Sequence, residues 1–308
     1  MQKNLVYPMR GIIPPLVTPL LDNNTLDVEG LERLIEHVIS GGVHGIFILG
    51  TTGEFASLGY SLRQELIERT CLLVKGRVPV LVGISDSAFA ESLNLARKSA
   101  DCGADAVVLT PPYYFSSGQP ELLEYFKRIM AQMPLPLFIY NMPVHTKVMI
   151  APETVLAASE IPGIIGMKDS SANLPYFNQV QYLLRDRPDF TFMVGPEEIL
   201  PEFVLMGGHG GVNGGANLFP KLYVDLYDAS VTRDFEKISL LRGKVLQICS
   251  SVYNVGHFGS SYLKGLKCAL SIQGICSDFM AEPFHRFKEN ERAKIKEALS
   301  NLDLTGIL

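Results

Sequence analysis

Lys168 is the side chain at a predicted strand end that is best suited to covalent chemistry. It follows the apolar run that begins at Ile164 and precedes Asp169 and Ser170, which have turn character. An apolar run that ends in a charge is typical of a buried parallel strand reaching the rim of an active site. Partial desolvation frees the amine of such a lysine to attack a carbonyl carbon. The alternative is a solvated lysine that pairs with Asp169.

Other predicted strand ends carry glycines and hydroxyl groups. The strand predicted at 45–49 runs into Gly50-Thr51-Thr52-Gly53. The backbone N–H groups and hydroxyls of this segment suit a small carboxylate, although an ordinary tight turn has the same composition. Tyr140 ends the strand predicted at 137–140 and could transfer a proton, or it could simply be a half-buried barrel tyrosine. With Lys168, this set predicts a Schiff base formed on a 2-oxo acid.

The sequence offers no spacing that is typical of a metal site. Its histidines form no HxH or HxxxH pair and its cysteines form no CxxC pair. We therefore expect neither a metal nor another cofactor, and a metal-dependent aldolase is the less favoured alternative. The acidic pair Glu197-Glu198 opens a predicted helix, where carboxylates are stabilised by the helix dipole. The histidines are His37, His44, His145, His209, His257 and His285.

Strands and helices alternate regularly along the first part of the chain. Eight such units in about 220 residues favour a closed (β/α)8 TIM barrel over an open sheet, and no GxGxxG follows the first strand. From about residue 220 only helices are predicted, which gives a barrel over 1–222 and a C-terminal α-helical appendage over 223–308. Strands are predicted at 11–17 (interrupted by Pro14-Pro15), 45–49, 78–82, 106–109, 137–140, 164–168, 191–194 and 210–212. Helices are predicted at 28–40, 62–74, 88–102, 121–130, 152–159, 174–184, 197–206, 223–230, 234–250, 260–273 and 290–300.

Composition excludes several classes of protein. The net charge is −5, the pI is about 5.7 and no block of like charges occurs, which argues against nucleic acid or an anionic membrane as a partner. Five scattered cysteines do not make a disulfide framework and fit a reducing cytoplasm. No apolar run is long enough for a membrane span, and the N-terminus has no signal-peptide core. We expect a soluble cytoplasmic protein.

Five motifs, in order and over nearly the whole chain, resemble those of one family. It is the dihydrodipicolinate synthase / N-acetylneuraminate lyase family of class I, pyruvate-dependent aldolases. The motifs are Gly50-Thr51-Thr52-Gly53-Glu54, Pro112-Tyr113-Tyr114, Tyr140-Asn141-Met142-Pro143, Gly166-Met167-Lys168-Asp169 and Gly207-Gly208-His209-Gly210.

The resemblance implies a role for each residue of the reacting centre. Lys168 would form the Schiff base with pyruvate, and Tyr140 would transfer protons. Gly50, Thr51 and Thr52 would bind the pyruvate carboxylate. Val212 matches a position whose backbone carbonyl faces the pyruvate adduct.

The resemblance also implies an assembly. Thr52 would link Tyr140 to Tyr114, and in such families this second tyrosine completes the site of a neighbouring subunit. A homo-oligomer is therefore expected, usually a tetramer built as a dimer of dimers.

The second substrate is where the sequence departs from the best-known members. The synthases carry an arginine where this chain has His145, which is shorter and mostly neutral at pH 7; Lys147 is the nearby alternative cation. Glu197-Glu198 stands where sialate lyases bind sugar hydroxyls, but Gly214 replaces their serine. We expect reversible cleavage of a 2-keto-3-deoxy sugar acid, or a similar 2-oxo substrate, to pyruvate and an aldehyde. The alternatives are dihydrodipicolinate synthase, N-acetylneuraminate lyase and a non-catalytic barrel that binds 2-oxo acids.

Overall fold

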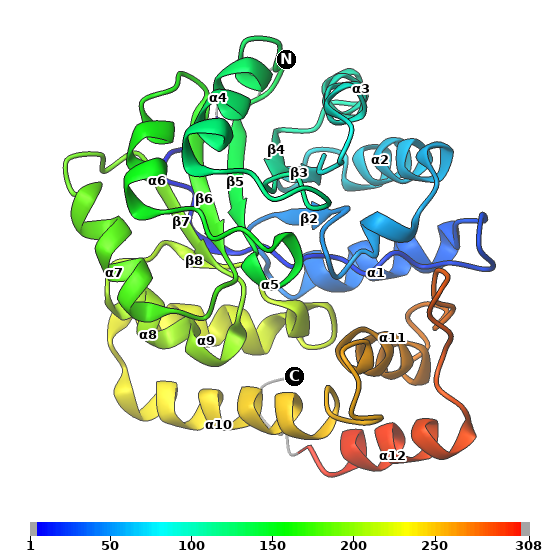
Figure 1. Ribbon diagram of the computed structural model, residues 1–308. Coiled ribbons are helices and arrows are strands. Elements are labelled where there is room, and N and C mark those ends of the chain that lie inside the picture. Colours follow the sequence, from blue (N-terminus) through cyan, green and yellow to red (C-terminus); the bar gives the residue numbers. More distant parts are fainter. Residues whose placement is uncertain (1–4, 303–308) are drawn as a thin grey trace.

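A barrel of eight parallel strands forms the centre of the molecule (Figure 1), as the sequence predicts. The computed structural model describes residues 5–302. The strands are hydrogen-bonded in the order β1-β8-β7-β6-β5-β4-β3-β2, and a parallel bridge between Pro15 and Phe47 closes the ring. Their bounds are β1 Gly11–Ile12, β2 Ile46–Ile48, β3 Val80–Gly83, β4 Ala106–Leu109, β5 Leu137–Asn141, β6 Ile164–Asp169, β7 Thr191–Val194 and β8 Gly210–Gly211.

The closing strand is much shorter than the predicted segment 11–17. Pro14 and Pro15 have no N–H to donate, so the regular ladder of β1 ends before them. Pairing with β2 continues through the groups that remain. Phe47 N–H donates to the Pro14 carbonyl at 3.0 Å, and Leu16 N–H donates to the Phe47 carbonyl at 2.8 Å.

Helices surround the strands (Figure 1). The long predicted helices are confirmed to within a few residues, but the predicted helix 197–206 is divided into η2 and α8, and α5 was not predicted. The helices are α1 Val28–Ser40, α2 Tyr60–Val74, α3 Phe89–Asp101, α4 Gln119–Met130, α5 Pro143–Thr146, α6 Pro152–Ser159, α7 Leu174–Leu183, α8 Leu200–Leu205, α9 Pro220–Thr232, α10 Phe235–Ser251, α11 Ser261–Ile272 and α12 Glu289–Ser300. Short 3-10 turns are η1 Phe55–Ser57, η2 Glu197–Ile199 and η3 Gly214–Asn217.

Two apolar clusters hold the layers together. The larger one lies between the strands and the helices, and α1 shows how a helix joins it. The Asp27 carboxylate caps its start by accepting the Gly30 N–H at 2.8 Å, and Leu31, Leu34 and Val38 form its buried stripe. The smaller cluster fills the barrel interior with Met9, Ile13, Phe47, Leu81, Ala106, Val108, Phe138, Tyr140, Met193 and Val212.

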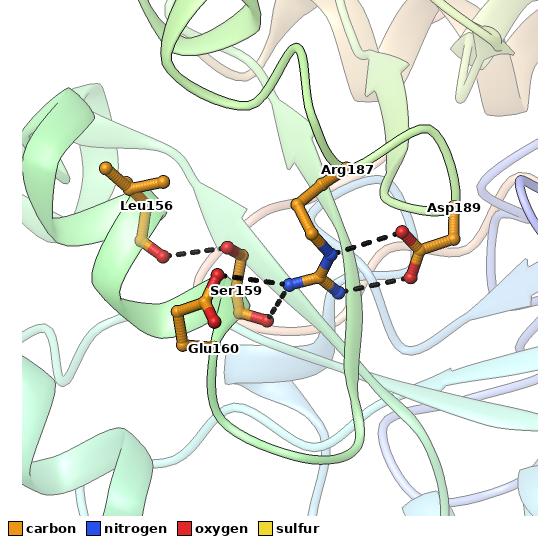
Figure 2. Close-up of polar contacts among 5 residues, drawn as sticks. All are labelled: Leu156, Ser159, Glu160, Arg187 and Asp189. Atoms are coloured by element: carbon orange, nitrogen blue, oxygen red, sulfur yellow. Dashed lines mark hydrogen bonds and ion pairs between the residues drawn. The ribbon is translucent and has the colours of Figure 1, made fainter.

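Arg187 joins the segments that lead into β6 and β7 (Figure 2). It donates to the Ser159 carbonyl at 2.7 Å, near the end of α6. It also forms a two-pronged contact with Asp189, with N–O distances of 3.2 and 3.1 Å. Glu160 adds a longer ion pair at 3.4 Å. These bonds lie where the strands begin, so they stabilise the barrel at the end opposite the carboxyl ends of the strands.

The last three helices form a layer along one side of the barrel (Figure 1). α9 begins before the predicted boundary at residue 222 and packs on β1, so a division at that boundary stays a prediction. One buried ion pair joins the layer to the loop after β2. Lys267 in α11 donates to Glu54 at 2.7 Å and to the Thr18 carbonyl at 2.9 Å. Both charged side chains are almost fully buried, with exposed fractions of 0% and 2%.

None of the helices within residues 5–302 is both long enough and apolar enough to cross a membrane.

We expect Lys267→Met to lower the free energy of unfolding by about 3–5 kcal/mol, because it leaves the Glu54 carboxylate buried without its cation. The matched control is Lys221→Met. Lys221 pairs with Asp225 at 2.6 Å on the surface, where the lysine is 52% exposed, so its loss should cost under about 1 kcal/mol. Urea unfolding followed by circular dichroism compares the two. Equal losses would show that the buried pair does not stabilise the fold.

Candidate active site

Lys168 points into the barrel interior because side chains alternate along β6. Its side chain is only 6% exposed. The register of β5 against β6 places Tyr140 directly beside it. The Lys168 Nζ lies 4.1 Å from the centre of the Tyr140 ring and 5.0 Å from that of the Phe47 ring. Aromatic faces attract a cation, so they stabilise an amine that water does not reach freely.

Asp169 is on the opposite face of the same strand and does not pair with Lys168. Its carboxylate accepts hydrogen bonds from Asn141 Nδ2 at 2.8 Å and from the Ser171 hydroxyl at 2.8 Å. Burial raises the pKa of the Asp169 carboxyl, although these bonds oppose the effect. The alternative of a solvated lysine paired with Asp169 is therefore wrong. Asp169 instead joins the carboxyl ends of β5 and β6.

The Tyr140 hydroxyl sits among polar groups at the carboxyl end of β5. The Ser170 hydroxyl donates to it at 3.3 Å. Burial raises the pKa of Tyr140, but the charge of Lys168 and the polar groups of Ser170 and Thr51 outweigh burial, so the pKa lies below its usual value. A phenol of this kind can give up and take back a proton more readily than a free tyrosine. Val212 lies in the same interior cluster, and the predicted role of its carbonyl stays a prediction.

The turn Gly50–Gly53 follows β2 at the mouth of the barrel. Gly53 N–H donates to the Gly50 carbonyl at 3.0 Å, and the Thr18 hydroxyl donates to the Gly53 carbonyl at 2.7 Å. A Cβ on Gly50 would lie 2.6 Å from the Phe47 ring, so only glycine fits there. The next residue, Glu54, is held by Lys267 and by the Ala281 N–H, which donates to its carboxylate at 2.9 Å. The turn is thus fixed from both sides.

The hydroxyls of the two threonines lie near different tyrosines. Thr51 contributes to the lowered pKa of Tyr140, whereas the Thr52 hydroxyl lies 3.0 Å from the hydroxyl of Tyr262 in α11. The predicted link from Tyr140 through Thr52 to Tyr114 stays a prediction. Tyr114 is 81% exposed on the loop before α4, where its ring packs edge-on against Phe115. Its predicted role at the site of a neighbouring subunit stays a prediction.

Glu197 lies in the interior with its carboxylate fully engaged. Gly215 N–H donates to one oxygen at 2.9 Å, and the hydroxyls of Tyr223 and Tyr253 donate to the other at 2.7 and 2.8 Å. Burial raises the pKa of Glu197, opposed by these bonds. The Glu197 carboxylate thus joins η2 to η3, to α9 and to the segment directly after α10. Its predicted role in binding the aldehyde therefore gains no support. Glu198 is exposed beside it.

A cavity of about 300 Å³ opens beside the turn after β2. Thr51 and the exposed His145 of α5 both line it. Partial burial lowers the pKa of His145, and the nearby charge of Lys147 lowers it further, so the imidazole is neutral at pH 7. The Lys147 amine is bonded to the Val144 carbonyl at 2.7 Å. Most of the wall is apolar or aromatic: Phe55, Tyr113, Met142, Leu263 and Phe284.

Two of the polar residues in this region were not predicted from the sequence. Ser170 could have been found, because it directly follows β6 and lies two positions beyond Lys168, where the alternation of side chains would turn it to the same side. Tyr262 could not, because it lies on a helix far along the chain and no local pattern marks it. Within the described part of the chain, no group of three or more His, Cys, Asp or Glu side chains could hold a metal ion.

Comparison with known proteins gives consistent matches along the chain. The Dihydrodipicolinate synthetase family matches residues 8–302. A 4-hydroxy-tetrahydrodipicolinate synthase from Methanospirillum hungatei is 30% identical over 295 residues, which covers 95% of this chain and 99% of that protein.

Solved structures also match over nearly the whole length of both chains. A dihydrodipicolinate synthase from the commensal bacterium Bacteroides thetaiotaomicron is 61% identical, with a TM-score of 0.95 over 97% of this chain and 100% of that one. YagE, a prophage protein from E. coli K12 solved in complex with pyruvate, is 29% identical, with a TM-score of 0.90 over 96% of this chain and 99% of that one.

We expect Glu197→Ala to lower the free energy of unfolding by about 3 kcal/mol or more, because it leaves three buried donors without an acceptor. Glu198→Ala, at the exposed neighbouring position, should change it by under about 0.5 kcal/mol. Chemical unfolding measures both. If Glu197→Ala proved as stable as Glu198→Ala, the internal role of this carboxylate would be refuted.

Proposed function

The chain belongs to the dihydrodipicolinate synthetase family, and on this basis we propose that it cleaves a 2-oxo acid reversibly to pyruvate and an uncharged aldehyde. The motif resemblance to this family is confirmed by the match over residues 8–302. The chain is accordingly a class I pyruvate-dependent lyase that acts through a lysine Schiff base. The observation that carries the proposed site is the buried pair of Lys168 and Tyr140, in register on neighbouring strands.

Lys168 is the proposed nucleophile. Its Nζ attacks the ketone carbon of the substrate, and the resulting hydroxyl takes a proton from Tyr140 and leaves as water, which gives a protonated imine. When the bond between the carbon next to the imine carbon and the hydroxyl-bearing carbon breaks, the imine cation accepts its electron pair, so the aldehyde leaves and an enamine remains on the lysine. The enamine carbon then takes up a proton, and water releases pyruvate and restores the amine. The imine itself is the electron sink, so this sequence of steps requires no added cofactor.

Tyr140 is the proposed proton carrier for these steps. Its lowered pKa suits removal of the proton from the substrate hydroxyl as the C–C bond breaks. The phenol can afterwards deliver a proton to the enamine carbon. The bond from the Ser170 hydroxyl holds the phenol beside Lys168. The turn Gly50–Gly53 is the proposed site of the carboxylate, with the Thr52 hydroxyl and the backbone N–H groups that the turn does not itself use as donors.

An uncharged aldehyde is proposed because the described walls of the cavity beside the turn offer no free charged group to pair with. No lysine or arginine is among its described lining residues, and His145 at its rim is neutral. The one carboxylate in its wall, Glu54, is already paired with Lys267. A charged group on the aldehyde would lose its hydration there without gaining a partner. Sugar-derived aldehydes carry uncharged hydroxyls, which cost less to remove from water than a charge does, and this favours 2-keto-3-deoxy sugar acids as substrates.

Dihydrodipicolinate synthase activity is the second candidate. It is favoured by the names of the relatives, including the Bacteroides thetaiotaomicron structure that is 61% identical. This reaction condenses pyruvate with aspartate semialdehyde, whose carboxylate needs a cation. His145 stands where the motif resemblance would place that cation. Sialate cleavage is less favoured, because Glu197 is engaged in the interior.

A homo-oligomer, built as a dimer of dimers, is part of the same proposal. Tyr114 and Phe115 expose 81% and 80% of their surface on one loop. Two adjacent aromatic side chains in water are costly for a protein that stays a monomer. Contact with a second copy of this chain would bury them.

Incubation with pyruvate and borohydride should add one reduced pyruvate adduct per chain, because borohydride reduces the imine to a stable amine. Intact-protein mass and peptide mapping locate it. We expect the adduct on Lys168 and none in Lys168→Ala. Lys221→Arg is the control, because the Lys221 amine pairs with Asp225 on the surface and should not be the site of attachment. Modification of another lysine, or none at all, would refute the Schiff-base site. Pyruvate binding without turnover of any aldehyde would support the non-catalytic alternative.

A substrate panel separates the two candidate activities. We expect pyruvate release from 2-keto-3-deoxy sugar acids and little condensation with aspartate semialdehyde. His145→Arg should raise kcat/KM for aspartate semialdehyde about 10- to 100-fold, because a guanidinium can bond its carboxylate. His145→Gln, which is similar in size but uncharged, should give no such gain. Efficient condensation by the unmodified protein would instead establish the synthase.

A further inference from the structure

Tyr262 brings a hydroxyl from the C-terminal helices to the proposed carboxylate site. It lies in the first turn of α11, and its Oη is 3.0 Å from the Thr52 Oγ1. Its side chain also lines the cavity beside the turn. A Cβ on Gly214 would overlap the Tyr262 hydroxyl, so glycine at that position makes room for it. This hydroxyl therefore sits between the end of β8 and the turn after β2.

The position of Tyr262 is set by packing within the same chain. Its ring packs edge-on against Tyr253, with ring centres 4.8 Å apart. Tyr253 in turn donates its hydroxyl to the buried carboxylate of Glu197 at 2.8 Å. The hydroxyl of Tyr262 is thus held at Thr52 by a rigid set of buried rings.

The direction of the bond between the two hydroxyls matters. A threonine hydroxyl has one proton to donate and can accept from another donor. Burial raises the pKa of Tyr262, so the phenol stays protonated and can donate to Thr52. The Thr52 proton is then free for a second acceptor. Hydrogen bonds arranged in such a chain strengthen one another, most of all when the last acceptor carries a charge.

We propose that Tyr262 is a positioning residue, which donates to Thr52 and so directs the Thr52 hydroxyl toward the carboxylate of the 2-oxo acid. This inference rests on the carboxylate site proposed above. It gives the C-terminal helices a part in substrate binding, from within the same chain. It also separates the two threonines by role, since Thr51 helps to lower the pKa of Tyr140 whereas the Thr52 hydroxyl bonds Tyr262.

Tyr262→Phe removes the donor but keeps the ring against Tyr253, so it is the variant that tests the proposal. Two readouts depend on pyruvate alone. The pyruvate concentration that gives half-maximal borohydride trapping reports binding, and exchange of the pyruvate methyl protons in D₂O, followed by NMR, reports proton transfer. We expect the half-saturating concentration to rise about tenfold, and the limiting exchange rate to change by under about threefold.

A double-mutant cycle shows whether Tyr262 acts through Thr52. Thr52→Val should weaken pyruvate binding at least as much as Tyr262→Phe does, and the double variant should match Thr52→Val alone. Thr52→Ser keeps the hydroxyl and should restore binding to within about twofold. Additive losses in the double variant would refute the proposal, as would a lower limiting exchange rate with unchanged binding.

Tyr176→Phe is the matched control for a merely structural effect. It loses the buried bond from the Tyr176 hydroxyl to the Ile150 carbonyl at 2.7 Å, which joins α7 to the segment before α6, so Tm should fall while half-saturation stays within about twofold. Equal weakening of pyruvate binding in Tyr176→Phe would overturn the proposal. Absence of any adduct in the unmodified protein would refute the proposed function and this inference together. An adduct with unchanged half-saturation in Tyr262→Phe would refute this inference only.

Discussion

The enclosure of Lys168 inside a closed barrel is the constraint on which the site depends. Because Lys168 is only 6% exposed, little water solvates its amine, and the rings and polar groups around it take the place of that water. The Tyr140 ring is 4.1 Å away because β5 and β6 pair in one register, and the Phe47 ring is near because the bridge to Pro15 closes the barrel through β2. A slip of one residue in β6 would turn Asp169 inward in place of the lysine.

The C-terminal helices complete this site, because buried polar groups of the barrel find their partners there. Lys267 neutralises Glu54 directly after the threonine turn, and Tyr262 bonds Thr52 within it. Tyr253 donates a hydrogen bond to the buried Glu197 carboxylate after β7. Buried groups of this kind are costly when they lack a partner. The appendage therefore stabilises the same loops that surround the proposed substrate.

The two halves of the proposed substrate meet surroundings of different chemical character. The reacting half faces a lysine, a tyrosine with a lowered pKa and a turn rich in donors, which together suit a 2-oxo acid. The departing half faces mostly apolar walls with a neutral His145 at the rim. The first set of groups lies on the barrel strands and the turn after β2, and we propose that the second set decides which aldehyde is accepted.

The sequence by itself determined the barrel, because apolar runs that alternate with helical patterns mark its strands. It also determined that Lys168 and Tyr140 lie at strand ends. Ser170 could have been identified by the same reasoning. The sequence alone did not predict that Pro14 and Pro15 would shorten β1 to Gly11–Ile12, nor that α5 would form at Pro143–Thr146. Which side chains pair was decided only by the tertiary structure. Thr52 with Tyr262, and Glu197 with Tyr223 and Tyr253, are contacts between elements far apart in the chain, and only their packing brings these hydroxyls and carboxylates within bonding distance.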